Sequence, residues 1–375
     1  MQAELTRPVD PNAFVELAVA RARERRVDLG PDDFWRRLQG RETSLHGPEA
    51  GELAADWPPA GWLPSAVGPP GSPHVDWAHF ADEPLAEPFF GDSLRKATAR
   101  PFNRVFRVRT SLATLVDGAG RGARRPTGLI FHFSRCGSTL AAQMLAAVPA
   151  YTVVSEAAPI DDVTRLDCID PQDRAGVLAA MVAAVGRPRL AAERRLFVKL
   201  DAWHILAEAA FRRAFEGAPW VFIYRDPLEV LVSQMRRRGA HTVRGVLPDA
   251  MYGVDAEVPD DEYCAIVLRR TCEAAVSAFA RGGGRLVNYA DLPAALETQI
   301  LPHFGEAPSA ADRALMARAA GRDAKTPWQD FDADTDAKRR EASPRLQRLA
   351  LQHLAEPYLA LEALRLAGAP PAGVR

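Results

Sequence analysis

The sequence lacks any apolar run near the ~18 residues needed to span a bilayer. Its first ten residues carry charges and a proline where a secretory signal would need an apolar core. We therefore expect a cytoplasmic protein that does not insert into a membrane. Net charge is also nearly absent, because 47 basic residues face 48 acidic ones. This balance gives no indication of a nucleic-acid partner, so any anion site must be local.

Cysteine and metal-ligand patterns are scarce as well. None of the four cysteines forms a CxxC pair, and they are too scattered for a disulfide framework: Cys136, Cys168, Cys264 and Cys272. Reduced thiols are therefore expected. The eight histidines are dispersed and no H-E-x-x-H motif occurs, so we expect no metal site.

The N-terminal part, residues 1–110, is predicted to be a helical and Pro/Gly-rich extension. Residues 12–41 have the spacing of two short amphipathic helices. Residues 57–88 are dense in proline and glycine, which predicts an extended loop that links or covers other elements. A group of aromatic residues should either pack on the sheet domain, which we favour, or line a substrate pocket: Trp77, Phe80, Phe89 and Phe90.

A different pattern follows, in which short apolar runs alternate with helical segments. The predicted strands are "TGLIFHFS", "YTVVSE", "LFVKL", "PWVFIYR" and "RLVNYADL". Helices should begin near Ser138, near His204, at Pro227 and around Asp261. We expect a three-layer α/β fold with a mostly parallel central sheet over residues 111–308. Residues 309–375 should form a helical tail, interrupted by a polar stretch at residues 321–342, with a final helix over residues 344–366.

The segment "LIFHFSRCGSTLAAQML" predicts a strand, a polar turn and a helix. Such a junction aims backbone N–H groups and the positive helix end at one place, where a phosphate binds. The predicted ligands are Arg135, Cys136, Gly137, Ser138 and Thr139. The lysine of the P-loop of nucleoside triphosphatases is missing, which argues against ATP hydrolysis. An ordinary turn capped by Ser138 is the alternative interpretation.

A second junction, "PWVFIYRDPLEVLVSQMRRRG", ends a strand at Arg225 and starts a helix at the proline that follows Asp226. Ser233 lies about two turns into that helix, so it and Arg225 could hold one phosphate together. Alternatively, Arg225 forms a salt bridge to Asp226 or Glu229. Both junctions lie at the carboxyl ends of predicted strands, where ligands bind in open α/β sheets.

Arg-x-Gly-Ser-Thr in the first junction, Arg-Asp-Pro with Val-Ser in the second, and the Tyr-x-Asp-Leu of "RLVNYADL" together resemble the sulfotransferase family over residues 125–292. The resemblance implies 3′-phosphoadenosine 5′-phosphosulfate (PAPS) as co-substrate and 3′,5′-adenosine bisphosphate as product, without a metal. Residues 135–139 would bind the 5′-phosphosulfate, and Arg225 with Ser233 the 3′-phosphate.

Sulfuryl transfer needs charge stabilisation on the leaving phosphate and a base for the acceptor proton. The resemblance implies Lys199 as the cation. Cytosolic sulfotransferases have Lys-x-His here, but this chain has Asp201 in place of the histidine. Glu156 corresponds to a catalytic glutamate of the protein-tyrosine sulfotransferases and is slightly favoured as the base over Asp201, with His204 behind both.

The tail contains "GRDAKTPWQDFDADTDAKR", which could be a mixed-charge loop in water. Sulfotransferases commonly fold a late basic loop over the 3′-phosphate, so Arg322 or Lys325 is predicted to reach the cofactor. The acceptor, a small molecule or peptide with a hydroxyl or amine, and the oligomeric state stay open. The alternatives are a small-molecule P-loop kinase and a non-catalytic nucleotide-binding or scaffolding protein.

Overall fold

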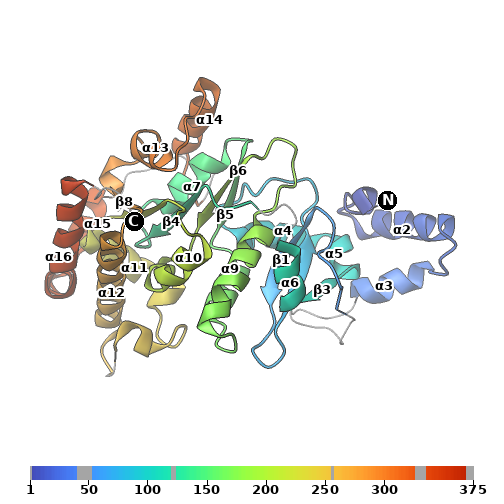
Figure 1. The fold of residues 1–375 in the computed structure, drawn as a ribbon, viewed down its shortest axis with the longest axis horizontal. Coiled ribbons are helices and arrows are strands. Elements are labelled where there is room, and N and C mark those ends of the chain that lie inside the picture. Colours follow the sequence, from blue (N-terminus) through green and yellow to red (C-terminus); the bar gives the residue numbers. More distant parts are fainter. Residues whose placement is uncertain (1, 40–52, 120–123, 255–256, 326–334, 369–375) are drawn as a thin grey trace. The chain divides into compact units, whose positions relative to one another are not determined.

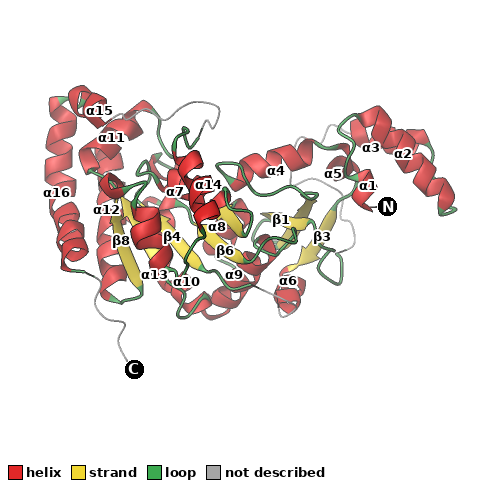
Figure 2. Ribbon diagram, turned by 90° about the horizontal axis from the view of Figure 1, so that it is seen from above, coloured by secondary structure: helices red, strands yellow, loops and turns green. Residues whose placement is uncertain are grey.

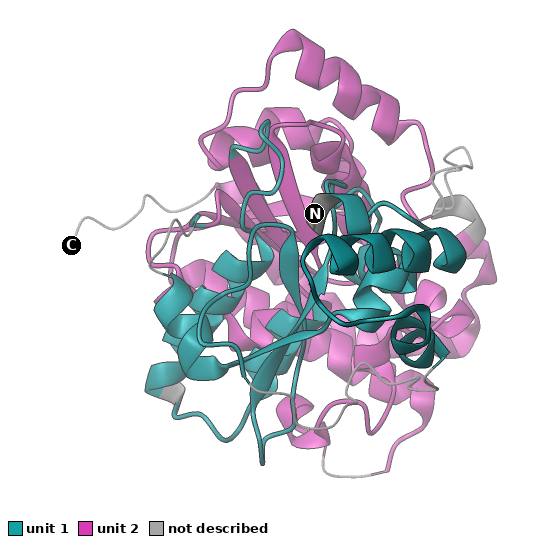
Figure 3. Ribbon diagram, turned by 90° about the vertical axis from the view of Figure 1, so that its right-hand side faces the viewer, with its two compact units in different colours: residues 1–125, 156–194 teal, residues 126–155, 195–375 magenta. Residues whose placement is uncertain are grey.

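The computed structural model describes residues 2–39, 53–119, 124–254, 257–325 and 335–368. The chain forms two compact units, coloured separately in Figure 3. Unit 1 comprises residues 1–125 and 156–194, and unit 2 comprises residues 126–155 and 195–375. The three-segment organisation expected from the sequence stays a prediction. In the structure, residues 156–194 belong to the same compact unit as the N-terminal part.

Unit 2 contains a five-stranded parallel sheet in the order β5-β6-β4-β7-β8 (Figure 1). Its strands are β4 (Gly128–His132), β5 (Tyr151–Ser155), β6 (Arg195–Lys199), β7 (Trp220–Tyr224) and β8 (Gly284–Asn288). Every residue of β4 and β7 is buried, so both faces of these central strands are covered. The predicted α/β class and all five predicted strands are confirmed.

Helices follow the strands in unit 2, and α12 and α16 pack beside β8 (Figure 2). The helical elements of this unit are α7 (Ser138–Ala146), η1 (Ala202–Ala207), α10 (Glu208–Ala214), α11 (Pro227–Arg236), η2 (Ala240–Thr242), η3 (Asp249–Tyr252), α12 (Asp260–Ala280), η4 (Tyr289–Asp291), the π-helical turn η5 (Leu296–Ile300), α13 (Leu301–His303), α14 (Ala310–Ala320), α15 (Thr335–Glu341) and α16 (Pro344–Ala367).

Local capping explains where two of these helices begin. The carboxylate of Asp226 accepts hydrogen bonds from the N–H groups of Leu228 and Glu229 at the start of α11. The hydroxyl of Ser343 accepts from the N–H of Leu346 at the start of α16. The predicted starts at Pro227 and Pro344 are confirmed. The polar interruption includes α15. It also includes residues 326–334, and these lie outside the described residues.

Unit 1 combines helices with a three-stranded antiparallel sheet in the order β1-β2-β3. The two predicted N-terminal helices are confirmed as α2 and α3. The elements of this unit are α1 (Gln2–Leu5), α2 (Pro11–Glu24), α3 (Pro31–Gln39), β1 (Trp62–Val67), β2 (His74–His79), α4 (Phe90–Ala99), α5 (Pro101–Val105), β3 (Val108–Ser111), α6 (Leu112–Ala119), α8 (Ala158–Arg165) and α9 (Pro171–Val185).

The prediction that residues 57–88 form an extended loop is wrong, because β1 and β2 form a hairpin there. Proline at position 64 obscured β1, yet it lies on an edge strand where the register shifts, and such a position tolerates a missing N–H. The densest group of prolines and glycines, residues 68–73, lies between the two strands. That group makes the hairpin turn, and the residues on either side of it make strands.

Arg187 explains how the chain before β1 is held within unit 1. Its guanidinium donates to the carbonyls of Pro58 and Trp62 and lies 5.8 Å and 5.5 Å from the ring centroids of Trp57 and Trp77. Burial, together with the positive charge of a neighbouring arginine, lowers the pKa of Arg187 to about 10. Backbone carbonyls and aromatic faces thus hold this cation.

The predicted aromatic group contributes to the core of unit 1. Trp77, Phe80 and Phe90 are buried. The indole N–H of Trp77 donates to the hydroxyl of Thr110 at 3.0 Å, and the rings of Phe80 and Phe90 lie 5.4 Å apart. These contacts show the aromatic group packed within unit 1, and its predicted packing on the sheet domain stays a prediction.

Among the described residues, no helix combines the length and the apolar character that crossing a bilayer requires.

Candidate functional site

The first candidate anion site is the turn between β4 and α7, residues 133–137, which we call the curled turn. Its backbone is tightly curled, because Ser134, Arg135 and Gly137 have φ values of 64°, 52° and 82°. Left-handed φ is ordinary for glycine but costs energy for the other two residues. The N–H of Ser134 donates to His132 Nδ1 at 3.1 Å, which holds the curl. A turn of this kind forms a backbone concavity suited to an anion.

Two contacts tie this turn to β7. The N–H of Phe133 and the thiol of Cys136 both donate to the carbonyl of Ile223, at 2.9 Å and 3.0 Å. Burial raises the pKa of the Cys136 thiol, while the N–H groups of Phe133 and Ser138 and the charge of Lys199 act in the opposite direction. The thiol therefore stays protonated and acts as a donor inside the turn.

The start of α7 supplies the rest of the first site. The hydroxyl-bearing residues Ser138 and Thr139 are buried at its first two positions. The N–H of Ala141 makes the bond to the Gly137 carbonyl, at 3.1 Å, so the N–H groups before it precede the helical ladder. The positive end of α7 thus lies at the curled turn. Arg135 is tied to the end of α11 through a hydrogen bond from Nη2 to the Arg237 carbonyl at 2.7 Å.

The second candidate site follows β7, the strand next to β4. Arg225 is 4% exposed, and Nε donates to Glu229 Oε2 at 2.7 Å. The salt bridge considered as the alternative for Arg225 is therefore present. Ser233, the other predicted ligand, is 9% exposed and lies on α11. Its role as an anion ligand stays a prediction, as does that of Arg225.

Two further charged residues belong to the second site. Glu229 is buried, and its Oε1 accepts from Arg339 Nε at 3.0 Å. Arg339 Nη2 also lies 3.6 Å from Asp226 Oδ2. The carboxylate of Glu229 thus bridges Arg225 and Arg339, which belong to distant parts of the sequence. The Arg225–Glu229 spacing of four residues at one helix start was a visible signal, but no sequence signal pointed to Arg339.

Tyr289 contacts both candidate sites. Its ring centroid lies 4.1 Å from the guanidinium carbon of Arg225. A Cβ atom added to Gly137 would lie 2.7 Å from Cδ2 of the same ring. The aromatic ring therefore packs between the curled turn and Arg225. No pattern in the sequence predicted this position of Tyr289.

Lys199 ends β6, beside β4, and its side chain is 0% exposed. Its positive charge is one of the influences that lower the pKa of the Cys136 thiol against the effect of burial. The role of Lys199 as the cation at the leaving phosphate stays a prediction.

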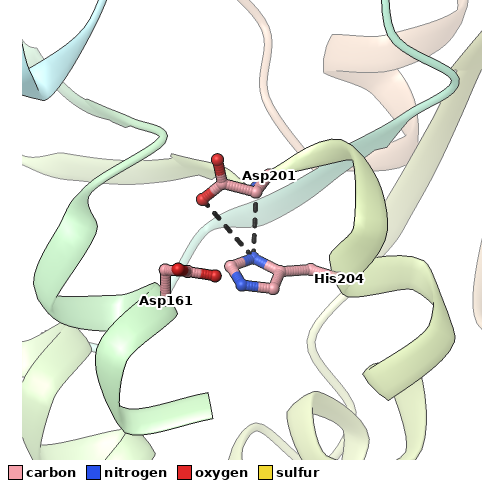
Figure 4. Close-up of side chains that lie close together, drawn as sticks. All are labelled: Asp161, Asp201 and His204. Atoms are coloured by element: carbon pink, nitrogen blue, oxygen red, sulfur yellow. Dashed lines mark hydrogen bonds and ion pairs between the residues drawn. The ribbon is translucent and has the colours of Figure 1, made fainter. Parts of the chain in front are cut away.

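Asp201 and His204 form a reciprocal cap at the start of η1 (Figure 4). The N–H of Asp201 donates to His204 Nδ1 at 3.1 Å, and Asp201 Oδ2 lies 3.9 Å from the same ring nitrogen, as the dashed lines show. The Asp201 carboxylate also accepts from the backbone N–H of His204. His204 is fully buried, with its ring against Trp203 and Phe211. Both predicted base candidates of this segment thus have a structural use, and a catalytic role for either stays a prediction.

The remaining predicted site residues are Glu156, Arg322 and Lys325. Glu156 directly follows β5 in the sequence, belongs to unit 1 and has a left-handed φ of 49°. Such strain in a residue other than glycine is often found at functional sites. Arg322 and Lys325 are exposed, and the N–H of Lys325 donates to Asp323 at 3.0 Å. Their predicted contact with the cofactor stays a prediction. Arg339, another basic residue of the tail, contacts Glu229.

A scan against models of protein families finds no match, and a search of curated proteins finds none. Several solved structures are similar in part, among them the following three. A sulfotransferase from Mycobacterium avium has a TM-score of 0.43 and 13% identity, covering 65% of this chain and 79% of its own. The sulfotransferase domain of the Synechococcus PCC 7002 olefin synthase has a TM-score of 0.39 and 17% identity, covering 67% and 98%. The sulfotransferase domain of the curacin biosynthetic pathway has a TM-score of 0.39 and 14% identity, covering 61% and 98%.

Proposed function

We propose that this chain is a sulfotransferase that transfers a sulfuryl group from PAPS to a hydroxyl or amine. The observation that carries the proposal is the arrangement of the curled turn after β4 and Arg225 after β7. These neighbouring strands end at the same edge of the sheet, and Tyr289 packs against both sites. A nucleotide phosphorylated at its 5′ and 3′ ends needs two such anion sites close together, at the edge of the sheet where ligands bind.

The residues of unit 2 fit such a nucleotide chemically. The curled turn offers backbone N–H groups, buried hydroxyls and a glycine that leaves no room for a side chain. In the proposal, residues 135–139 bind the 5′-phosphosulfate, and Arg225 with Ser233 binds the 3′-phosphate. Glu229 holds the Nε and Nη2 edge of Arg225. That contact orients the guanidinium fork, which reduces the entropy lost on binding an anion.

Lys199 is the proposed cation at the leaving phosphate. Because its ammonium group is buried, its attraction for developing negative charge is less screened than at a surface. The bond from the phosphate oxygen to sulfur breaks, a bond from the acceptor oxygen or nitrogen to sulfur forms, and the acceptor proton passes to a carboxylate. Glu156 is the first candidate for this base and Asp201 the second.

Binding of 3′,5′-adenosine bisphosphate tests the proposal directly. Wild-type protein should bind it at least about tenfold more tightly than 5′-adenosine monophosphate by calorimetry, because the 3′-phosphate adds charged hydrogen bonds. Arg225→Ala should remove this preference, while Arg313→Ala, at an exposed position on α14, should keep it. Since Arg225→Ala leaves buried Glu229 without that partner, Ser233→Ala provides a second variant with an intact salt bridge. Equal affinity of the wild type for both nucleotides would refute the proposal.

Transfer itself is tested with sulfur-labelled PAPS and fractionated cell extract as the acceptor source, followed by mass spectrometry of the product. The expected result is a labelled product that wild type forms and Lys199→Met does not, while both still bind the bisphosphate. Bisphosphate binding without transfer to any acceptor would favour the non-catalytic nucleotide-binding protein. Magnesium-dependent consumption of ATP would favour the kinase.

A further inference from the structure

Tyr289 occupies a place that neither anion site explains alone. The residue directly follows β8, and its ring lies with its face toward the Arg225 guanidinium at 4.1 Å. The same ring fills the space in which a side chain at position 137 would lie. Gly137 and Arg225 come from two different strand ends. One aromatic ring therefore contacts both strand ends.

Two contacts, one with Glu229 and one with Tyr289, restrict the guanidinium of Arg225. Glu229 binds the Nε and Nη2 edge, which fixes the guanidinium within its plane. The guanidinium carbon lies over the Tyr289 ring, so the ring limits movement of the guanidinium out of that position, and a desolvated cation over an aromatic ring is attracted to it. An arginine fixed in both respects loses little conformational entropy when it binds an anion.

The backbone that carries the ring is itself anchored. The Asn288 side chain accepts from the N–H of Ala290 at 3.0 Å and donates to the Glu362 carboxylate of α16 at 2.9 Å. The N–H of Leu292 donates to the Tyr289 carbonyl at 3.0 Å. Tyr289 is therefore held from its own backbone and from α16. Movement of the backbone at position 289 would have to disrupt these contacts as well.

We infer that Tyr289 is a positioning residue that fixes the spacing between the two anion sites and so selects nucleotides with phosphates at both the 3′ and 5′ positions. The inference rests on the proposed function and adds a specificity determinant to it. The ring, and not the phenol hydroxyl, carries this role, because the contacts with Arg225 and Gly137 involve the ring. A nucleotide with one phosphate uses a single site and is insensitive to the spacing.

The test compares Tyr289→Leu with the conservative variant Tyr289→Phe. Dissociation constants for 3′,5′-adenosine bisphosphate and 5′-adenosine monophosphate are measured by calorimetry for each protein, and thermal unfolding checks that each folds. Tyr289→Leu should weaken bisphosphate binding about tenfold and monophosphate binding less than about threefold. Tyr289→Phe should keep both affinities within about threefold of wild type. A merely structural role would lower both affinities together.

A second variant keeps the test sharp if Tyr289→Leu unfolds. Arg225→Lys keeps the charge but loses the flat surface that stacks on the ring, so it should lose the bisphosphate preference by a similar factor. The inference is wrong if Tyr289→Phe loses as much of the preference for the bisphosphate as Arg225→Lys does. It is also wrong if Tyr289→Leu folds and keeps the wild-type preference. In both cases the proposed function survives. If the wild type itself shows no preference, the proposed function fails and the inference fails with it.

Discussion

The side-chain amide of Gln234 donates a hydrogen bond to the hydroxyl of Ser134 at 3.1 Å, across 100 positions of sequence. Gln234 is 0% exposed, and its amide oxygen accepts from the N–H of Gly239 at 2.7 Å. This one side chain therefore connects the curled turn after β4 with the segment that follows α11. Because Gln234 directly follows Ser233 on α11, the two candidate anion sites share a buried polar link.

A double-mutant cycle measures this link. Gln234→Leu should lower the free energy of unfolding by about 1–3 kcal/mol, because it leaves the buried hydroxyl and N–H partners without their bonds. Ser134→Ala should cost about 1 kcal/mol, and the double variant should cost less than the sum of the two. Urea unfolding of the four proteins gives the coupling energy. Strict additivity would show that the hydrogen bond contributes nothing to stability.

Gly137→Ala tests the contact between the curled turn and Tyr289. The substitution has to adopt a φ of 82° and to displace a ring atom 2.7 Å away. The matched control is Gly305→Ala, where φ is 73° and no described atom lies within 4 Å of the added Cβ. We expect the control to lose about 1–2 kcal/mol through its backbone alone. Gly137→Ala should lose about 1–3 kcal/mol more through overpacking, measured by urea unfolding. Equal losses would contradict the packing of Tyr289 on Gly137.

The elements that the sequence predicted well are those encoded locally. The five strands of unit 2 are continuous apolar runs, and the starts of α11 and α16 carry a proline next to a capping residue. The curled turn after β4 was also visible, because polar and glycine residues end an apolar run there. In each case a single stretch of chain contains the whole signal.

The contacts that the sequence did not predict join distant stretches. Arg339 binds Glu229 across 110 positions, and Tyr289 stacks on Arg225 from the next strand of the sheet. Single-sequence patterns contain no information about such pairs. The hairpin of β1 and β2 was missed for a different reason. The prolines of its turn and the proline within its edge strand β1 contribute equally to the composition, so composition alone did not separate strand from turn.

His79, the last residue of β2, makes the stability of unit 1 depend on pH. Burial lowers the pKa of His79 to about 4, with a further lowering from Arg100, Arg189 and Arg187 and an opposing effect of Asp82. The unfolded chain binds a proton near pH 6.5, where the folded one does not. The contribution of neutral His79 to the free energy of unfolding is therefore fully present above pH 6.5. It is lost as the pH falls toward 4, by up to about 3 kcal/mol.

Substitution of His79 by asparagine tests this dependence. The Nδ1 atom of His79 accepts from the N–H of Ala81 at 3.0 Å, and an asparagine oxygen can replace that acceptor. Urea unfolding at intervals between about pH 7 and about pH 4 gives, for each protein, the slope of the free energy of unfolding against pH. The variant should have the shallower slope over this range. Indistinguishable slopes would show that His79 is not the titrating group.

The four cysteines should differ sharply in reactivity. Cys168 is exposed, whereas the other three thiols are buried. Burial raises the pKa of Cys136 and of Cys272, and raises that of Cys264 to about 12. Because the thiolate is the nucleophile, iodoacetamide at about pH 8 should modify Cys168 alone in the native protein and all four after denaturation. Peptide mass spectrometry reads the sites, and native modification of Cys136 at the rate of Cys168 would contradict the buried turn.

The carboxylate of Glu362 anchors α16 to the ends of β7 and β8. It accepts from the Tyr224 hydroxyl, from Asn288 Nδ2 at 2.9 Å and from Arg365 Nη2 at 2.8 Å. Burial alone would raise the pKa of Glu362, but these three hydrogen bonds outweigh it and lower the pKa to about 2. The stability that Glu362 contributes is thus present above pH 4.5 and is lost as the pH falls toward 2.

Glu362→Gln removes this contribution, and Glu356→Gln, an exposed position on the same helix, is the control with the same change of charge. At about pH 7 we expect Glu362→Gln to lose about 1–3 kcal/mol in urea unfolding and the control to lose less than about 0.5 kcal/mol. The difference between Glu362→Gln and wild type should narrow between pH 4.5 and pH 2, because the wild type loses its advantage there. Tyr224 and Asn288 directly precede Arg225 and Tyr289, so a loosened α16 should also weaken binding of 3′,5′-adenosine bisphosphate. A difference that stays constant over this whole range would show that the charge of Glu362 does not hold the helix.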